Sequence, residues 1–203
     1  MRLLVIRHAD QEFPCAPAFE DPPLTTAGHR QAQRLARALR GHALSRVVSS
    51  NMVRALQTAR PVASALRVPL VVEPRLAEIS MGELAPWGTA EQAEWDRITA
   101  CWAAGDLTCG CPGSESLADV MERVSPVVTR LLAQAGGRDF VIVGHAVVNG
   151  VILSVLCPSL RSMLGKNVGH SHTGIWELEG EGTRFRVLRR DDTQHLELVR
   201  RTR

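Results

Sequence analysis

The sequence contains no long apolar run, and this absence restricts the class of protein. A membrane-spanning helix needs about 18 or more consecutive apolar residues, and no stretch of the 203 residues approaches that length. Together with a mean hydropathy of −0.03, this argues against an integral membrane protein. We therefore expect no membrane partner.

Long blocks of basic residues are also lacking. The 24 basic residues nearly balance 21 acidic ones, for a net charge of +3, and lysine occurs once, at Lys166. The one basic cluster is the tail Arg200-Arg201-Thr202-Arg203. We interpret it as a solvated chain end rather than a nucleic-acid-binding arm, because short charge runs are usually solvated. No nucleic-acid partner is expected.

Signs of export are missing as well. The five cysteines are an odd number in a chain of this length, unlike the paired frameworks of small secreted domains. The apolar part of Met1–His8 is too short for a signal peptide, and no small-residue cleavage site follows it. The sequence thus predicts a cytoplasmic protein.

The composition, 45% hydrophobic and 22% charged, is that of a globular chain with one well-buried core. Unbroken β-branched runs predict strands buried on both faces of a parallel sheet at Leu3–Ile6, Arg46–Val48 and Phe140–Val143. A further strand is predicted at Leu70–Val72, and a hairpin from Gly174–Leu178 and Phe185–Leu188.

Helical patterns alternate with these strands. They cover Gln31–Leu39, Val53–Leu66, a long segment from Ser114 to about Gln134, and Ala146–Leu156. The alternation predicts an α/β fold: a three-layer sandwich with a mostly parallel central sheet and helices on both faces. Between residues 80 and 112 the pattern weakens into Gly, Pro, Trp and Cys, which we interpret as a lid insertion. Residues 1–203 are therefore expected to form a single domain.

Polar residues follow three of the predicted strands: Arg7-His8, Ser49-Ser50 and Gly144-His145. Parallel strands end at one edge of the sheet, where ligands bind, so these residues should meet there together with Arg54. Guanidinium groups match phosphate oxygens, and neutral imidazole can act as a nucleophile. The set suggests phosphoryl transfer without a metal. Taken singly, each residue also has a structural interpretation, as a buried histidine, a solvated arginine or a helix cap, and the pattern alone leaves both open.

Six segments in order resemble the histidine phosphatase superfamily, the phosphoglycerate-mutase-like group. The resemblance runs from Arg2 to about Leu196. The segments that carry it are Arg7-His8-Ala9, Leu24-Thr25-Thr26-Ala27-Gly28, Ser49–Ala59 with Arg54 inside it, Leu76-Ala77-Glu78-Ile79-Ser80-Met81-Gly82, Pro112-Gly113-Ser114-Glu115-Ser116 and Gly144-His145-Ala146.

The resemblance implies a metal-independent phosphatase, a phosphoric monoester hydrolase, that needs no cofactor. His8 would attack phosphorus and become a phosphohistidine. Glu78 would protonate the leaving oxygen and then activate water, because an alkoxide is a poor leaving group. Charge on the phosphoryl oxygens would be stabilised by Arg7, Arg54 and His145. The resemblance further implies substrate-binding roles for Thr25 and Ala146.

Two departures from the family pattern bear on the reaction. Ala9 stands where the signature usually has glycine, and the stretch Asp10-Gln11-Glu12-Phe13-Pro14 lacks the asparagine that mutase-type members carry. The lid also differs from that expected of a glycolytic mutase. These features favour a phosphatase acting on a small phosphomonoester. A phosphomutase of the phosphoglycerate mutase type and a weakly active phospho-ligand binding module remain alternatives, and the assembly is expected to be a monomer or a homodimer.

Other polar and aromatic residues are less informative. The thiols of Cys101, Cys109 and Cys111 are interpreted as reduced bystanders, because the Cys109-Gly110-Cys111 spacing is too tight for a common zinc site. The lid tryptophans, Trp87, Trp95 and Trp102, are expected in the lid core. His170 and His172 are interpreted as turn residues, with the mouth of a pocket as the alternative. Asn149 points either toward the site or into a capping network.

Overall fold

The protein folds around a six-stranded mixed sheet. A computed structural model describes residues 1–12, 21–82, 89–164 and 171–197. The strand order is β3-β2-β4-β1-β5-β6. Parallel pairing joins the first four, and β5 and β6 add an antiparallel hairpin to β1. The strands are β1 (Arg2–Arg7), β2 (Val47–Ser49), β3 (Leu70–Val72), β4 (Phe140–Gly144), β5 (Ile175–Glu181) and β6 (Arg184–Asp192). All six predicted strands are thereby confirmed.

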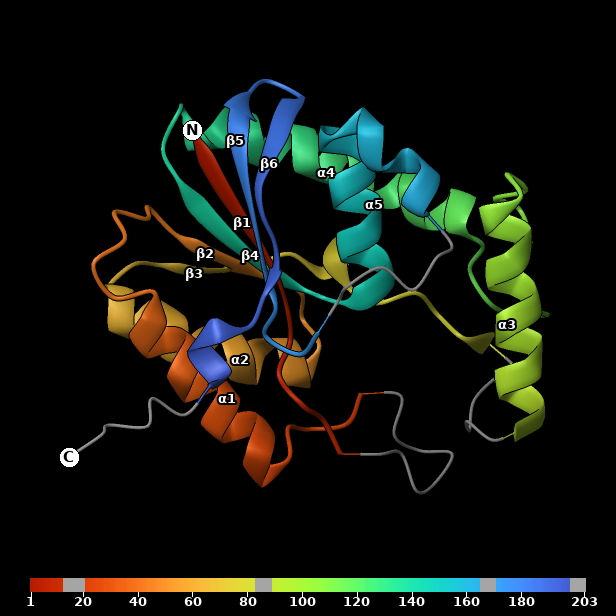
Figure 1. Cartoon of the computed structure of the whole chain (residues 1–203), viewed down its shortest axis with the longest axis horizontal. Coiled ribbons are helices and arrows are strands. Elements are labelled where there is room, and N and C mark those ends of the chain that lie inside the picture. The colour runs from red at the N-terminus through yellow and green to blue at the C-terminus, as the bar shows by residue number, and fades with distance from the viewer. Residues whose placement is uncertain (13–20, 83–88, 165–170, 198–203) are drawn as a thin grey trace.

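Helices cover both faces of the sheet, as the predicted three-layer sandwich requires (Figure 1). One face carries α1 (Thr26–Ala38) and α2 (Val53–Leu66), and the other carries α4 (Leu117–Ala135) and α5 (Ala146–Leu156). Short 3₁₀ turns lie at Pro74–Leu76, Pro158–Met163 and Gln194–Leu196.

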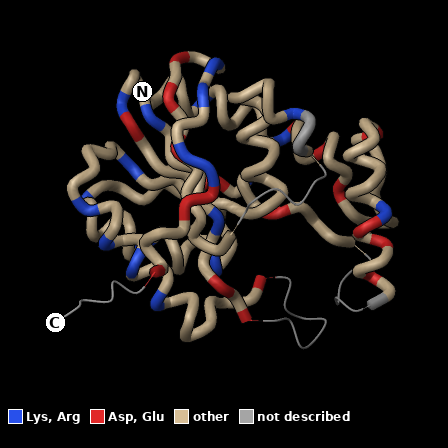
Figure 2. The backbone as a smooth tube through the Cα atoms, in the orientation of Figure 1, with Lys and Arg blue, Asp and Glu red and all other residues tan. Residues whose placement is uncertain are grey.

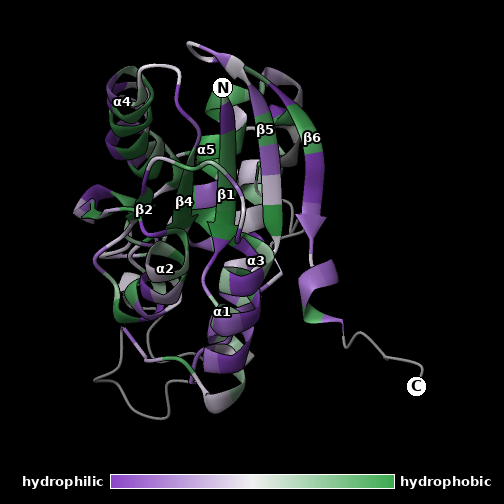
Figure 3. Cartoon of the chain, turned by 90° about the vertical axis from the view of Figure 1, so that its left-hand side faces the viewer, coloured by the Kyte–Doolittle hydropathy of each residue, from purple (hydrophilic) through white to green (hydrophobic). Residues whose placement is uncertain are grey.

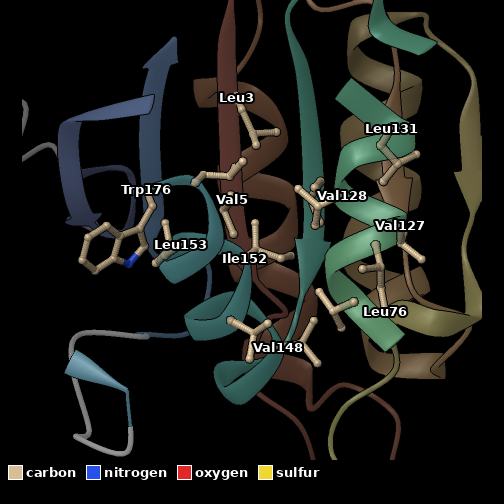
Figure 4. Packing of buried hydrophobic residues seen from close by; sticks show 14 of the residues in the cluster. Leu3, Val5, Leu76, Val127, Val128, Leu131, Val148, Ile152, Leu153 and Trp176 are labelled. Carbon is tan, nitrogen blue, oxygen red and sulfur yellow. The ribbon is translucent and has the colours of Figure 1, made fainter. Parts of the chain in front are cut away.

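Successive side chains of β1 point to opposite faces of the sheet, so the hydrophobic core has two halves, one on each face. Leu3 and Val5 pack with α4 and α5, whereas Leu4 and Ile6 pack with α1 and α2. Figure 4 shows the first of these halves, with Val128 of α4 and Ile152 of α5 over the sheet. Each fully buried aliphatic side chain stabilises the fold by about 1.5–3 kcal/mol, which is why the buried interior of the central strands is hydrophobic, as in β1 between Arg2 and Arg7 (Figure 3).

The lid insertion contains a regular helix that the sequence pattern did not predict. Helix α3 spans Thr89–Ala103 and lies to the side of the sandwich (Figure 1). Its apolar residues do not form one continuous stripe; Ile98 and Trp102 are buried, and Trp102 meets Trp95 edge-on at 5.3 Å. The indole of Trp102 donates to the carbonyl of Cys109, which ties the helix to the following loop. Trp102 thus belongs to the lid core as expected, and Trp87 lies outside the described residues.

Charged residues are dispersed over the strands, helices and loops rather than gathered in one band (Figure 2). Within the described ranges, no helix combines the length and the apolar character needed to cross a membrane.

Candidate active site

The ends of three parallel strands bring the predicted site residues together. Arg7 pairs in register with Gly144, and Ser49 pairs with Val143. The backbone N–H of His8 donates to the carbonyl of Gly144 at 2.9 Å, just beyond the sheet. The expected convergence of these strand ends is therefore confirmed.

His8 is buried, and its hydrogen bonding defines which ring nitrogen is available. Nδ1 lies 2.8 Å from the carbonyl oxygen of Ala9, which can only accept, so Nδ1 carries the proton. The backbone N–H of Ala9 donates to Thr58 Oγ1, which holds this carbonyl in place. Burial, followed by the charges of Arg54 and Arg7, lowers the pKa of His8 well below its usual value. These effects favour the neutral imidazole, with its lone pair on Nε2.

Two guanidinium groups lie close enough to this imidazole for their charges to lower its pKa. Arg7 ends β1, and Arg54 lies in the first turn of α2. Asp21 accepts from the N–H of Val53 at 2.7 Å and from Arg54 Nη1 at 3.2 Å, so one carboxylate both caps the helix and orients the arginine. Burial lowers the pKa of both arginines, while the nearby charge of Glu78 opposes that effect. Arginine nevertheless remains protonated, so the site is strongly positive.

His145 forms the second imidazole of the site. It is the N-cap residue of α5, fully buried, with its ring centroid 5.2 Å from that of His8. Nε2 lies 2.7 Å from Ser50 Oγ, so β2 and α5 are joined through this contact. Burial and the neighbouring His8, Arg54 and Arg7 lower the pKa of His145 well below its usual value.

Glu78 reaches the same region from the loop after the Pro74–Leu76 turn. Its carboxylate oxygens accept from the backbone N–H groups of Val147 and Val148, each at 3.3 Å, at the N-terminus of α5. Ala146 opens this helix, next to His145. The carboxylate is close enough to Arg7 and Arg54 to influence their pKa values. It therefore lies at the edge of the positive site, on a helix N-terminus.

The Glu78 loop is held from behind by an ion pair. Arg123 of α4 binds both oxygens of Glu115, at 2.6 and 2.9 Å, and donates to the carbonyls of Arg75 and Glu78. Glu115 in turn accepts from the N–H of Ser80 at 2.9 Å. Hydrogen bonds thus fix the loop on both sides of the carboxylate.

Thr25 is the N-cap of α1, and its hydroxyl is already engaged. It donates to Asp10 Oδ2 at 2.6 Å and accepts from the N–H of Gly28 at 2.8 Å. A side chain at Gly28 would overlap the carbonyl oxygen of Asp10, so the glycine allows this close approach. The contact of Thr25 with phosphate stays a prediction, and so does that of Ala146.

His172 lies in a turn, as predicted, and its ring also faces the site, which is the alternative that the sequence left open. Its ring centroid lies 5.5 Å from that of His8, and Nδ1 lies 3.5 Å from Asp10 Oδ1. Burial and the charge of Arg7 lower its pKa to about 4, although Asp10 acts in the opposite direction. His172 lies 27 positions after His145 in the chain, so local spacing alone could not decide between the turn and the pocket mouth. His170 lies outside the described residues.

Asn149 and the lid cysteines are the remaining residues that the sequence left ambiguous. The amide of Asn149 is buried, with its oxygen against Gly144, and neither amide atom has a hydrogen-bond partner among the described residues. Cys101, Cys109 and Cys111 are free thiols. Over residues 1–12, 21–82, 89–164 and 171–197, no group of His, Cys, Asp or Glu has the arrangement of a metal site.

Comparison with known proteins gives consistent matches. The model of the histidine phosphatase superfamily (branch 1) matches residues 3–193. A probable phosphoglycerate mutase GpmB from Proteus mirabilis is 28% identical over 77% of this chain and 74% of its own length. Another, from Yersinia enterocolitica, is 25% identical over 98% of this chain and 96% of its own.

Solved structures agree with this match. Bacillus stearothermophilus YhfR superimposes with a TM-score of 0.82 and 26% identity, covering 97% of this chain and 99% of that one. A mycobacterial glucosyl-3-phosphoglycerate phosphatase superimposes with a TM-score of 0.77 at 23% identity, over 95% and 99% of the two chains. The second likeness is one of fold alone.

Proposed function

Because this chain belongs to the histidine phosphatase superfamily, we propose that it hydrolyses small phosphomonoesters through a phosphohistidine formed on His8. The observation that carries the proposal is the state of His8. Nδ1 lies against the Ala9 carbonyl, which leaves Nε2 as the nucleophilic nitrogen, and burial together with the charges of Arg54 and Arg7 lowers the pKa of the ring and so favours its neutral form. The neutral ring is a nucleophile placed where an anionic phosphoryl group would be held.

The first step is displacement at phosphorus. The Nε2 lone pair forms the N–P bond while the ester P–O bond breaks, and the leaving oxygen takes a proton. The imidazole becomes positively charged as it does so, and the Ala9 carbonyl at Nδ1 stabilises that charge. Arg7 and Arg54 bind the phosphoryl oxygens, as planar donors suited to phosphate.

Glu78 supplies and removes the proton. Its loop and its contacts at the α5 N-terminus place the carboxyl group beside the arginines. Protonated, it donates to the leaving oxygen; ionised, it then accepts a proton from the water that attacks the phosphohistidine. Cleavage of the N–P bond releases phosphate and returns the lone pair to His8.

Hydrolysis of p-nitrophenyl phosphate between pH 5 and 8 in excess EDTA tests this proposal directly. The parent protein should turn over, and His8→Ala should lose activity because no other residue can accept the phosphoryl group. Alkaline quenching with labelled substrate should trap an acid-labile phosphoryl group on the parent alone. Activity of His8→Ala within tenfold of the parent would refute the mechanism.

A second candidate function, phosphomutase, is favoured by the names of the curated relatives, probable phosphoglycerate mutases. In a mutase the phosphohistidine transfers its phosphoryl group to the bound monophosphate, and the resulting bisphosphate has to stay bound until its other phosphoryl group returns to His8. Phosphoglycerate isomerisation should then be stimulated by a bisphosphate primer. Phosphate release without any primer effect favours the phosphatase.

A further inference from the structure

A loop held in an unusual backbone conformation places His172 against His8. Thr173 has φ of +58°, which is rare for a β-branched residue and costs energy. The loop is held there by the N–H of Thr173, which donates to the carbonyl of Arg7 at 3.1 Å. Ser171 is fixed in turn by its N–H and hydroxyl, which both donate to Asp191. These hydrogen bonds hold the loop in a backbone conformation that Thr173 would not adopt by itself, and the loop in turn fixes the position of His172.

Asp10 connects this histidine to the start of α1. One oxygen of the carboxylate accepts from Thr25 at 2.6 Å, and the other lies 3.5 Å from His172 Nδ1. The backbone N–H of Asp10 donates to Gln31 at 2.8 Å, which fixes the residue at its main chain as well. The carboxylate of Asp10 is thus oriented to accept a hydrogen bond from a protonated Nδ1 of His172.

The second ring nitrogen of His172, Nε2, takes no part in the contacts with Asp10. Nε2 is buried, and it has no hydrogen-bond partner among the described residues. The ring that carries it lies beside the ring of His8, the group that would accept phosphate. A buried polar atom without a partner is costly, so a ligand atom here would remove a penalty.

We infer that His172 is a further phosphate-binding residue, whose Nε2–H donates to an oxygen of the phosphoryl group while Asp10 holds Nδ1–H. The inference rests on the proposed function for the identity of the ligand. It makes Asp10 a positioning residue that acts through His172, and Thr25 a residue that orients Asp10.

Both donors are present only when His172 is an imidazolium, so phosphate binding should be coupled to uptake of one proton from solvent. The groups that face His172 are Arg7, His8 and Asp10. In the free protein burial and Arg7 favour the neutral ring. The negative charge of a bound phosphate dianion opposes the charge of Arg7 and, like that of Asp10, raises the pKa of His172.

Calorimetric binding of inorganic phosphate to the full chain tests the inference. His172→Phe keeps a ring against His8 but removes both donors, and it should weaken binding by about tenfold or more, the expected cost of a lost hydrogen bond to a charged group. His172→Gln keeps a donor near the position of Nε2 and should recover part of this loss. Asp10→Asn should fall between the parent and His172→Phe. His29→Phe, at an exposed position on α1, is the matched control and should bind like the parent.

Repeating the titration at pH 7 in buffers of different ionisation enthalpy should show proton uptake in the parent that is reduced in His172→Phe. Phosphate binding by His172→Phe within twofold of the parent would overturn the inference, as would equal losses in the Gln and Phe variants. A parent that binds no phosphate would overturn it too.

The outcomes also separate this inference from the proposed function. If the parent hydrolyses p-nitrophenyl phosphate but His172→Phe binds phosphate normally, the inference fails and the phosphatase stands. If the parent binds phosphate through His172 without any turnover, the phosphatase fails and the inference stands.

Discussion

Replacement of Arg123 by methionine should loosen the loop that carries Glu78. Arg123 makes two hydrogen bonds to Glu115, at 2.6 and 2.9 Å, and two more to loop carbonyls. Methionine has a similar length and retains packing on α4 but makes none of these bonds. Glu115 would then keep the N–H of Ser80 as a partner but lose its compensating charge.

The expected loss of stability depends on how exposed the Arg123–Glu115 ion pair is. Removing one partner of a fully buried ion pair costs about 3–5 kcal/mol, whereas an exposed pair contributes about 0–1 kcal/mol. The side chains of Arg123 and Glu115 are 21% and 26% exposed, between these cases. We therefore expect Arg123→Met to lower the free energy of unfolding by about 1–3 kcal/mol. Glu115→Gln combined with Arg123→Met should restore part of it, because no uncompensated charge remains.

The relative rates on two substrates show whether the variant displaces the Glu78 carboxyl group or disturbs the structure in general. An alkyl phosphate needs its leaving oxygen protonated, whereas p-nitrophenolate leaves readily without help. Relative to p-nitrophenyl phosphate, hydrolysis of β-glycerophosphate should fall by about tenfold, within the ~100-fold that a 1 Å misplacement can cost.

The matched control is Arg130→Met. Arg130 lies on the same helix as Arg123 but pairs with Glu73, before the Pro74–Leu76 turn. It should leave the ratio of the two substrates unchanged. Urea unfolding measures the first effect, and kcat/KM on both substrates measures the second. An unchanged substrate ratio together with less than about 0.5 kcal/mol of destabilisation, the level of an ordinary surface substitution, would refute the reasoning.

Two further predictions concern Glu78 and the buried histidines. Glu78→Gln cannot donate a proton, so it should slow β-glycerophosphate hydrolysis by about 10²–10⁴-fold and p-nitrophenyl phosphate far less; equal losses on both substrates would argue against an acid role. His8, His145 and His172 have lowered pKa values, so below about pH 6.5 the unfolded chain binds protons that the folded protein does not. Stability should therefore fall with decreasing pH, by up to about 1.4 kcal/mol per pH unit for each histidine. Urea unfolding at pH 7.5 and 5.5 measures this difference, and equal stability at the two values would contradict it.

The main architecture was predictable because hydrophobic patterning determines it. Buried parallel strands are recognisable as short β-branched runs, and β1, β2 and β4 were found in this way. Helix α3 was missed because its apolar residues do not repeat on one face, and its contacts with the rest of the core come from Ile98 and Trp102. Packing, rather than local periodicity, is what identifies it.

The candidate site was also predictable only in part from local sequence. Residues at strand ends, such as His8 and His145, could be brought together from sequence, since parallel strands share one carboxyl edge. The carboxylate of Glu78 was named from family resemblance, and its place on the α5 N-terminus is a property of the fold.

By itself, the sequence determined the layers of the sandwich, the edge at which the imidazoles and guanidinium groups meet, and the family. Only the tertiary structure decided that the neutral form of His8, with its lone pair on Nε2, is favoured, because that depends on burial and on the Ala9 carbonyl. It also decided the contact of His172 with Asp10 and His8. Residues 162 positions apart in the chain meet there because β5 pairs with β1, and no local pattern encodes such a contact.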